Sequence, residues 1–188
     1  MMPAKKILVL MGLVLLGFNG CSNSMFMNST DSAVVIYGGL NMEEAEGDTL
    51  QNVVVELINP APKNENERYL FSHTKNNVFA FSEVKPNAVY ELVRFEGLQV
   101  VDHWYNSVKK RITHDFNIPK KSRPTIKTGN PGSIFYFGSY RYKKLKDGYT
   151  LEKVPGNEQE NFVLKKVKRL ASGSTWETVF EKRMNELE

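Results

Sequence analysis

Short apolar runs separated by turn residues fill most of the chain between Ala33 and Val154. In residues 78–83, Phe79 and Phe81 alternate with smaller residues, and in residues 134–138, Phe135 and Phe137 alternate with Ile134, Tyr136 and Gly138. Alternation with a period of two predicts strands whose two faces differ. Turn signals recur roughly every 8–12 residues, a spacing typical of a sandwich or barrel. We therefore expect a mainly β fold, an antiparallel β-sandwich, over residues 33–154.

Clusters of glycine, proline, asparagine and charged residues divide this region into candidate strands. Gly38-Gly39 is expected to end the first strand and Glu96-Gly97 the fifth, while Lys75-Asn76-Asn77 and Asp147-Gly148 predict hairpin turns. The predicted strands are residues 33–37, 50–58, 68–74, 78–83, 88–95, 100–105, 111–118, 132–142 and 149–154.

After Pro155-Gly156 the hydrophobic period lengthens to that of an α-helix. Two amphipathic stripes follow, one on each side of Ser172-Gly173. Before each stripe a polar residue is followed three positions later by glutamate, which is the capping-box spacing. The pattern predicts a C-terminal helical hairpin over residues 155–188, packed on the sandwich. The stripes contain Val163, Val167 and Leu170, and Trp176, Val179, Phe180, Met184 and Leu187; the capping pairs are Asn157 with Glu160 and Ser174 with Glu177.

The first residues of the chain have the layout of an export signal. Lys5 and Lys6 precede the apolar run Ile7 to Phe18, which is 12 residues long. A membrane-spanning helix needs about 20 residues, so we expect residues 1–20 to be a cleaved signal peptide. Residues 21–32 are rich in Ser, Asn and Thr and predict a flexible tether. Alternatively, residues 25–27 pair with the first strand or touch the bilayer surface.

Gly20 followed by Cys21, the single cysteine, resembles the lipobox of bacterial lipoproteins. Phe18 and Asn19 depart from the usual leucine and small residue of that motif. The resemblance implies that Cys21 becomes the acylated first residue, anchored in the bacterial cell envelope, and Ser22 fits sorting to the outer membrane. Stable anchoring takes more than one acyl chain, a condition that a diacylated or triacylated cysteine meets. The alternative is a cysteine that merely lies near an ordinary signal cleavage site.

Removal of the signal changes the charge balance. The whole chain has 25 basic and 21 acidic side chains, and loss of Lys5 and Lys6 leaves 23 against 21. A nearly neutral exported protein is not expected to bind nucleic acid. No second cysteine exists to form a disulfide or a thiolate zinc site. Stability must therefore come from hydrophobic burial, for which the 167 residues after Cys21 suffice.

Residues with catalytic potential are few. His73, His103 and His114 do not have metal-ligand spacing. Asp102 precedes His103 directly, and adjacent residues of a strand point to opposite faces, so this pair does not form an acid–base site. The chain contains neither a G-x-S-x-G nor a P-loop motif. We therefore expect no catalytic residue, no metal and no cofactor, and a protein that is not an enzyme.

Three further stretches each have two interpretations. The acidic segment from Glu43 to Asp48 forms a calcium site or, because it lacks EF-hand spacing, a solvated loop. The basic segments at residues 109–111 and 120–127 contact anionic lipid or lipopolysaccharide, or are solvated loops. The aromatic residues between Phe135 and Tyr142 line a ligand groove or belong to the core. The solvated loops and the core are the simpler interpretations.

Two stretches carry a wider resemblance. Residues 84–92 have the form V-x-P-x-x-x-Y-x-L, with Asn87 where glycine is common, and residues 132–138 have the form G-x-I-x-Y-x-G. Together with Cys21 they resemble bacterial lipoproteins of uncharacterised function that have a prealbumin-like or immunoglobulin-like sandwich. The resemblance covers roughly residues 33–154 and implies a fold and an envelope location.

From these features we expect a membrane-anchored envelope lipoprotein that acts as a non-enzymatic structural or protein-interaction module, with an envelope protein as its partner. The alternative is a carrier of a small ligand or lipid, which would use a cleft between the sheet and the C-terminal helices.

Overall fold

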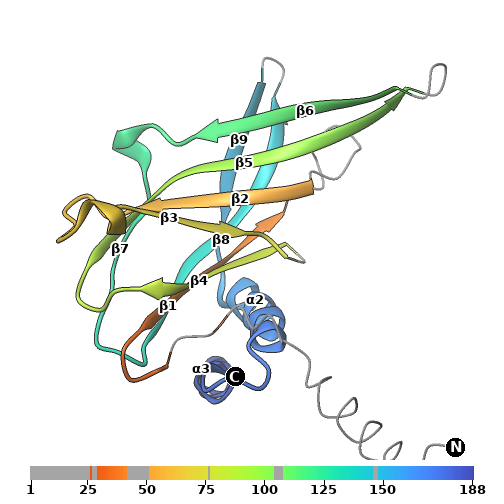
Figure 1. The fold of residues 1–188 in the computed structure, drawn as a ribbon. Coiled ribbons are helices and arrows are strands. Elements are labelled where there is room, and N and C mark those ends of the chain that lie inside the picture. Colours follow the sequence, from red (N-terminus) through yellow and green to blue (C-terminus); the bar gives the residue numbers. More distant parts are fainter. Residues whose placement is uncertain (1–25, 27–28, 42–50, 76, 104–107, 146–147) are drawn as a thin grey trace, which may run out of the picture.

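A computed structural model describes residues 26, 29–41, 51–75, 77–103, 108–145 and 148–188. Two β-sheets pack face to face, and two C-terminal helices cover the outer face of one of them (Figure 1). The predicted β-sandwich with a C-terminal helical pair is confirmed. The predicted signal peptide, Cys21 and the acidic segment from Glu43 to Asp48 lie outside the described residues. Among those residues, no helix has the length and apolar character needed to span a bilayer.

Sheet A, the sheet that the helices cover, has the strand order β4-β1-β8-β9. Its β1–β4 and β8–β9 pairs are antiparallel, as expected, whereas β1 and β8 are parallel. The long stretch of chain between β1 and β8 makes this possible, because a parallel pair needs a long connection. The strands are β1 (Val34–Asn41), β4 (Val78–Val84), β8 (Ile134–Leu145) and β9 (Gly148–Val154).

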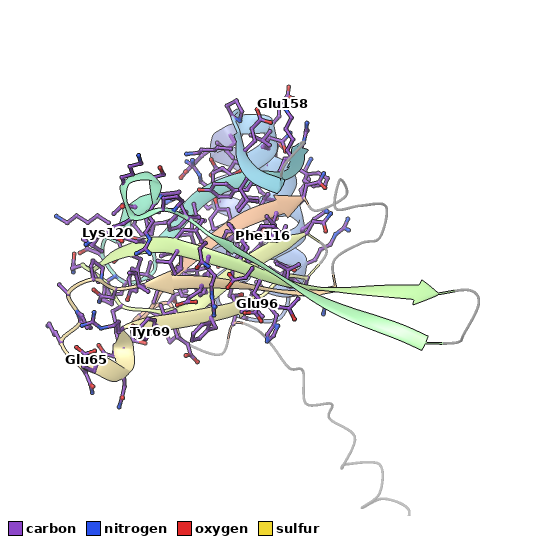
Figure 2. All side chains as sticks on the ribbon, turned by 90° about the horizontal axis from the view of Figure 1, so that it is seen from above. Glu65, Tyr69, Glu96, Phe116, Lys120 and Glu158 are labelled. Carbon is purple, nitrogen blue, oxygen red and sulfur yellow. The ribbon has the colours of Figure 1, made fainter. Side chains whose placement is uncertain are left out.

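Sheet B has the order β3-β2-β5-β6, with the short β7 paired to the beginning of β5. Strand β2 pairs with β5 only as far as Leu98, while β5 and β6 stay paired to His103 and Val108. The ends of β5 and β6 therefore project as a two-stranded arm (Figures 1 and 2). The strands are β2 (Gln51–Ile58), β3 (Tyr69–His73), β5 (Val89–His103), β6 (Val108–Asn117) and β7 (Thr125–Lys127); the 3-10 helices are η1 (Glu65–Glu67) and η2 (Lys120–Ser122).

Two predicted strand ends and one predicted strand pairing are wrong. Gly38-Gly39 lies inside β1, and Glu96-Gly97 lies inside β5, because both glycine-containing pairs are held in ladders by neighbouring strands. The predicted hairpin between residues 68–74 and 78–83 forms only at its turn, where Lys75 and Val78 make an isolated antiparallel bridge, and its two strands do not continue as a ladder. Instead, β3 pairs with β2 and β4 pairs with β1, so the chain crosses there from sheet B to sheet A. The edges of the two sheets consequently lie side by side, joined where the Ser72 hydroxyl donates to the Ala80 carbonyl at 2.7 Å.

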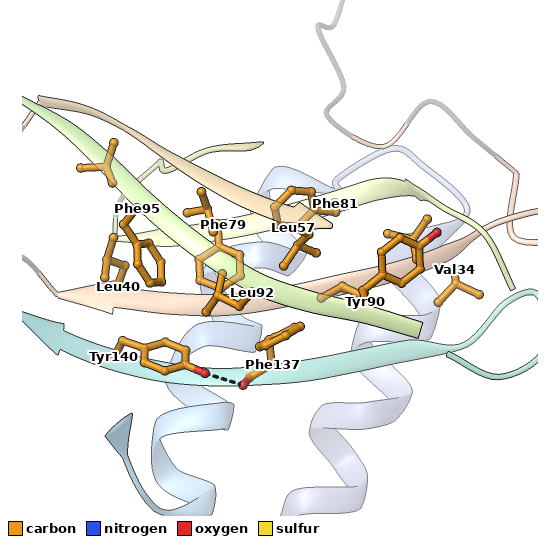
Figure 3. Close-up of a cluster of buried hydrophobic side chains, with 14 residues drawn as sticks. Val34, Leu40, Leu57, Phe79, Phe81, Tyr90, Leu92, Phe95, Phe137 and Tyr140 are labelled. Carbon is orange, nitrogen blue, oxygen red and sulfur yellow. Dashed lines mark hydrogen bonds between the residues drawn. The ribbon is translucent and has the colours of Figure 1, made fainter. Parts of the chain in front are cut away.

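Strand β1 contributes to two hydrophobic clusters through its two faces. Val34, Ile36 and Leu40 point into the sandwich, where they meet residues of sheet B, as Figure 3 shows for Val34, Leu40 and Leu57. Val35 and Tyr37 point the other way and pack under the helices. The aromatic residues of β8 also belong largely to the core, since Phe137 and Tyr140 are buried in the sandwich.

The turn before β5 explains the V-x-P-x-x-x-Y-x-L pattern of residues 84–92. Asn87 has a φ of 53°, in the left-handed region where glycine is otherwise favoured and asparagine is tolerated. The side chain of Tyr90 is buried, and its hydroxyl accepts a hydrogen bond from the Lys85 backbone N–H at 3.0 Å. This hydrogen bond holds the turn against the first residues of β5.

The helices are α2 (Asn157–Leu170) and α3 (Trp176–Leu187). The capping box predicted at Asn157 is wrong, because Gly156 occupies the N-cap position and no side chain caps this helix. At the second helix the predicted polar pair does act at the N-terminus. The Trp176 N–H donates to the Ser174 hydroxyl at 3.3 Å, and the Gly173 N–H donates to the Glu177 carboxylate at 2.9 Å.

Candidate functional site

The carboxylate of Glu160 lies where β1, α2 and α3 meet, and Glu160 is only 7% exposed. The Tyr37 hydroxyl donates to its Oε1 at 2.9 Å. Arg183 donates from Nε to Oε1 at 2.8 Å and from Nη2 to Oε2 at 3.3 Å. The Nη1 of Arg183 contacts Glu186 at 3.3 Å. We call Tyr37, Glu160 and Arg183 the polar cluster.

The position of these residues follows from the hydrophobic pattern. Tyr37 occupies the face of β1 that points toward the helices. Glu160 lies one turn before Val163 and Leu164, on the apolar stripe of α2, and Arg183 lies beside the stripe of α3. A carboxylate on a buried stripe is costly unless it is paired and hydrogen-bonded. The polar cluster supplies that pairing at the edge of the second hydrophobic cluster.

The charges of the polar cluster are fixed by its surroundings. Burial raises the pKa of the Tyr37 phenol well above its ordinary value near 10, and the charge of Glu160 raises it further. Hydrogen bonds to Glu160 raise the pKa of the Arg183 guanidinium. Tyr37 is therefore a neutral donor and Arg183 a permanent cation. Each member is hydrogen-bonded to another, so the cluster connects the two helices to sheet A.

A cleft of about 620 Å³ opens beside the polar cluster, between the start of β8 and α3. Ile134, Tyr136 and Val179 form apolar parts of its wall, and Glu160 and Arg183 form the polar part. This is the place where the carrier hypothesis predicts a cleft. The Tyr136 hydroxyl is 2.7 Å from the Ser139 hydroxyl at this wall, and burial raises the pKa of Tyr136.

A second surface lies on the other sheet, at the edge strand β3. Tyr69 and Phe71 are 54% and 57% exposed, although both are large aromatic residues. Leu70 and Ser72 alternate with them, and Ser72 is buried. A groove of about 460 Å³ runs between residues 69–73 of β3 and residues 80–83 of β4. We call Tyr69, Phe71 and this groove the aromatic edge; Figure 2 labels Tyr69.

The aromatic edge was not predicted from the sequence. The signal that could have found it is the alternation from Tyr69 to His73, which places two aromatic residues on one face. Whether that face is buried or exposed depends on which face of the sheet is packed: Leu70 packs against the core, so Tyr69 and Phe71 lie on the opposite, outer face of sheet B. A single edge strand cannot be told from an inner strand by its own pattern.

The structure places the predicted candidate residues apart. His73, His103 and His114 lie on β3, β5 and β6, and His73 is exposed. Asp102 and His103 are paired in register with Lys109 and Val108 at the end of the arm. Across the residues described, no group of three His, Cys, Asp or Glu side chains is placed to hold a metal ion.

The two basic segments differ from the solvated loops that were expected. Residues 109–111 belong to strand β6, so the loop interpretation is wrong there. Residues 120–127 form η2 and β7, with Lys120, Lys121 and Lys127 exposed.

Comparisons with known proteins add little to this geometry. No family model matches the chain, and no curated protein matches it. Among solved structures, a 9R-lipoxygenase from Cyanothece PCC8801 is similar with a TM-score of 0.31 and 12% sequence identity. That match covers 86% of this chain and 25% of the lipoxygenase chain. A similarity at this level supports no argument about function, so the proposals below rest on the chain's own residues.

Proposed function

We propose that this protein is a bacterial envelope lipoprotein, anchored through lipid on Cys21, whose sandwich acts as a non-enzymatic protein-interaction module. The sequence from Lys5 to Cys21 supports the anchor, and Ser22 supports an outer-membrane location. The observation that carries the interaction role is the aromatic edge, where two large apolar side chains stand more than half exposed on an edge strand. Its partner is an extended segment of another envelope protein.

The backbone of β3 offers such a segment hydrogen-bonding groups. The Asn59 N–H donates to the Arg68 carbonyl at 2.8 Å, and the Thr74 N–H donates to the Val53 carbonyl at 2.7 Å. These bonds direct the even-numbered residues of β3 toward β2. Because backbone groups alternate in direction along a strand, those of Tyr69, Phe71 and His73 face the open side. An open edge of this kind is a template for strand addition.

The side chains beside this edge fit a protein partner. Tyrosine and phenylalanine are enriched at protein–protein interfaces, where their area contributes strongly to binding. The groove between β3 and β4 gives alternate side chains of an added strand a place to bury. Glu83 at its rim is exposed. An extended segment with apolar residues at alternate positions satisfies both the backbone and the groove.

Site-specific photo-crosslinking tests this proposal. With a photoreactive residue at position 71, the lipidated protein in host membranes is expected to give one discrete adduct with an envelope protein. The same residue at position 121, which is exposed on η2, is expected to give no such adduct. Tyr69→Lys, which charges the edge without touching the core, should abolish the adduct at position 71. No adduct, or the same adducts from both positions, would contradict the interaction role.

The cleft beside the polar cluster favours a second candidate function, the carriage of a small ligand. Its volume of about 620 Å³ lies within the roughly 300–1,000 Å³ of ligand sites. Native mass spectrometry of the protein from host membranes would then show a mass increment beyond the lipid anchor. That increment should disappear when Val179→Trp fills the cleft, and its absence from the wild type would contradict the carrier.

A further inference from the structure

Helix α2 presents a basic stripe to solvent, formed by Phe162, Lys165, Lys166 and Arg169. These residues follow one another at positions i, i+3, i+4 and i+7, so they share one face of the helix. Phe162 is 54% exposed, and Lys165 and Arg169 are exposed as well. The Lys166 ammonium lies 4.2 Å from the centre of the Phe162 ring. Exposed lysine and arginine side chains near an anionic lipid surface are attracted to it.

The described acidic residues of α2 and α3 leave two cations of the basic stripe, Lys165 and Arg169, without an ion pair. Lys168 points toward α3 and pairs with Glu181 at 3.0 Å, so Glu181 is already engaged away from the stripe. Of the two acidic residues in the first turn of α2, Glu160 is engaged by Tyr37 and Arg183, and Glu158 lies one turn before Phe162. Within the described part of the chain, Lys165 and Arg169 form no ion pair. Lys165 and Arg169 thus offer two positive charges that fit an anionic partner.

The N-terminal end of the described chain points to what that partner is. Phe26 is 2% exposed and packs edge-on against Phe180 of α3, with ring centres 5.6 Å apart. Phe26 therefore belongs to the folded domain, although it falls within the predicted tether. Five residue steps separate it from Cys21, a span of at most about 18 Å for an extended chain. A lipid on Cys21 thus lies close to the helices.

The short distance between Phe26 and Cys21 limits how the domain can be oriented on a membrane. A helix with its side chains is about 10–12 Å thick, so the anchor reaches the bilayer only if the helical layer is close to it. Sheet B lies on the opposite side of sheet A from the helices (Figure 1). The helices therefore face the membrane side, and the aromatic edge of sheet B stays accessible to a protein partner.

We propose that the basic stripe of α2 docks on anionic lipid headgroups of the leaflet that holds the Cys21 lipid. This inference rests on the proposed lipid anchor, which holds the helices near the bilayer. The basic stripe determines which face of the domain meets the headgroups. Attraction between exposed cations and an anionic surface is screened within about 10 Å at 0.1 M salt. The docking is therefore reversible by salt, whereas the lipid anchor is not.

Energy transfer from a single label tests this orientation. Because Cys21 is the only cysteine and would be acylated, Glu158→Cys creates one free thiol beside the stripe, and Lys63→Cys creates one on the loop after β2. Each lipidated full-length protein carries a donor dye on this thiol and is reconstituted into vesicles with an acceptor dye on the headgroups. We expect transfer from position 158 in phosphatidylcholine vesicles, because the short anchor keeps the helices near the bilayer, and stronger transfer in vesicles that also contain phosphatidylglycerol. Transfer from position 63 should be weak in all vesicles.

Charge reversal separates docking from mere proximity. Lys165→Glu with Arg169→Glu should reduce transfer from position 158 to its level in phosphatidylcholine vesicles. The matched reversal Lys120→Glu with Lys121→Glu, on exposed η2, should leave it unchanged. A protein that floats with the vesicles but shows equal transfer in both lipids, or no response to the α2 reversal, overturns this inference alone. A protein that floats with neither vesicle overturns the anchor and, with it, the docking.

Discussion

Gly38→Ala is expected to lower the free energy of unfolding by about 3 kcal/mol or more, the upper part of the range for overpacked cores. Gly38 lies in the middle of β1, between β4 and β8. A Cβ there would overlap the Phe79 ring and lie 2.7 Å from the carbonyl oxygen of Gly138. That oxygen belongs to the backbone of the neighbouring strand, so it cannot move without disturbing the ladder. Urea unfolding followed by tryptophan fluorescence measures the loss.

Gly39→Ala is the matched control, one residue along the same strand. Its Cβ would lie 2.7 Å from the Ser139 hydroxyl and 2.9 Å from a methyl group of Val163. Both are ends of side chains that can shift, so the expected loss is smaller. Phe79→Leu should relieve part of the Gly38→Ala defect in a double-mutant cycle. A Gly38→Ala loss equal to or below that of Gly39→Ala would contradict this account of the core.

Alkaline pH is expected to unfold the protein through its buried tyrosines. Burial raises the pKa of Tyr37 and Tyr140 well above the ordinary value near 10. Below pH 10 both phenols are protonated in the folded and the unfolded chain, so their contribution to stability is fully present. Above pH 10 the unfolded chain releases protons that the folded chain retains. The free energy of unfolding then falls by about 1.4 kcal/mol per pH unit for each such tyrosine.

The Tyr37→Phe variant measures how much Tyr37 contributes to this fall of the unfolding free energy with pH. The variant loses the hydrogen bond to Glu160, so it is less stable at all pH values, but it also loses one phenol that titrates only on unfolding. We therefore expect the slope of unfolding free energy against pH, measured between pH 10 and 11.5, to fall by about 1.4 kcal/mol per pH unit. A slope identical to that of the wild type would show that Tyr37 ionises freely in the folded state.

The sequence predicted the architecture because alternation and helical periodicity are local signals. The predictions based on turn residues failed where glycine makes room for a neighbouring side chain inside a strand. Gly38 and Gly39 look like a strand end, yet they make room for Phe79 on one face of β1 and Val163 on the other. Likewise, the turn signal before Val78 does form a tight turn, closed by the Lys75–Val78 bridge, yet the strands on its two sides join different sheets. Which strands pair is decided by contacts far apart in the sequence.

The polar cluster likewise could not be predicted from local sequence patterns. Glu160 stands three residues after Asn157, so its position predicts a helix cap. Its actual partners are Tyr37, 123 residues earlier, and Arg183 on the next helix. No short-range pattern links these three residues. The exposure of Tyr69 and Phe71 is equally non-local, because it depends on which face of sheet B packs against sheet A.

The lipid anchor on Cys21 is the claim on which the envelope location and the docking of α2 both depend. The most direct test is the intact mass of the protein purified from membranes of its host, measured beside a Cys21→Ser variant. We expect a chain that begins at Cys21 and carries a diacylglyceryl group, with or without a third acyl chain. A wild-type mass equal to that of an unmodified chain would contradict the anchor and leave a freely diffusing sandwich.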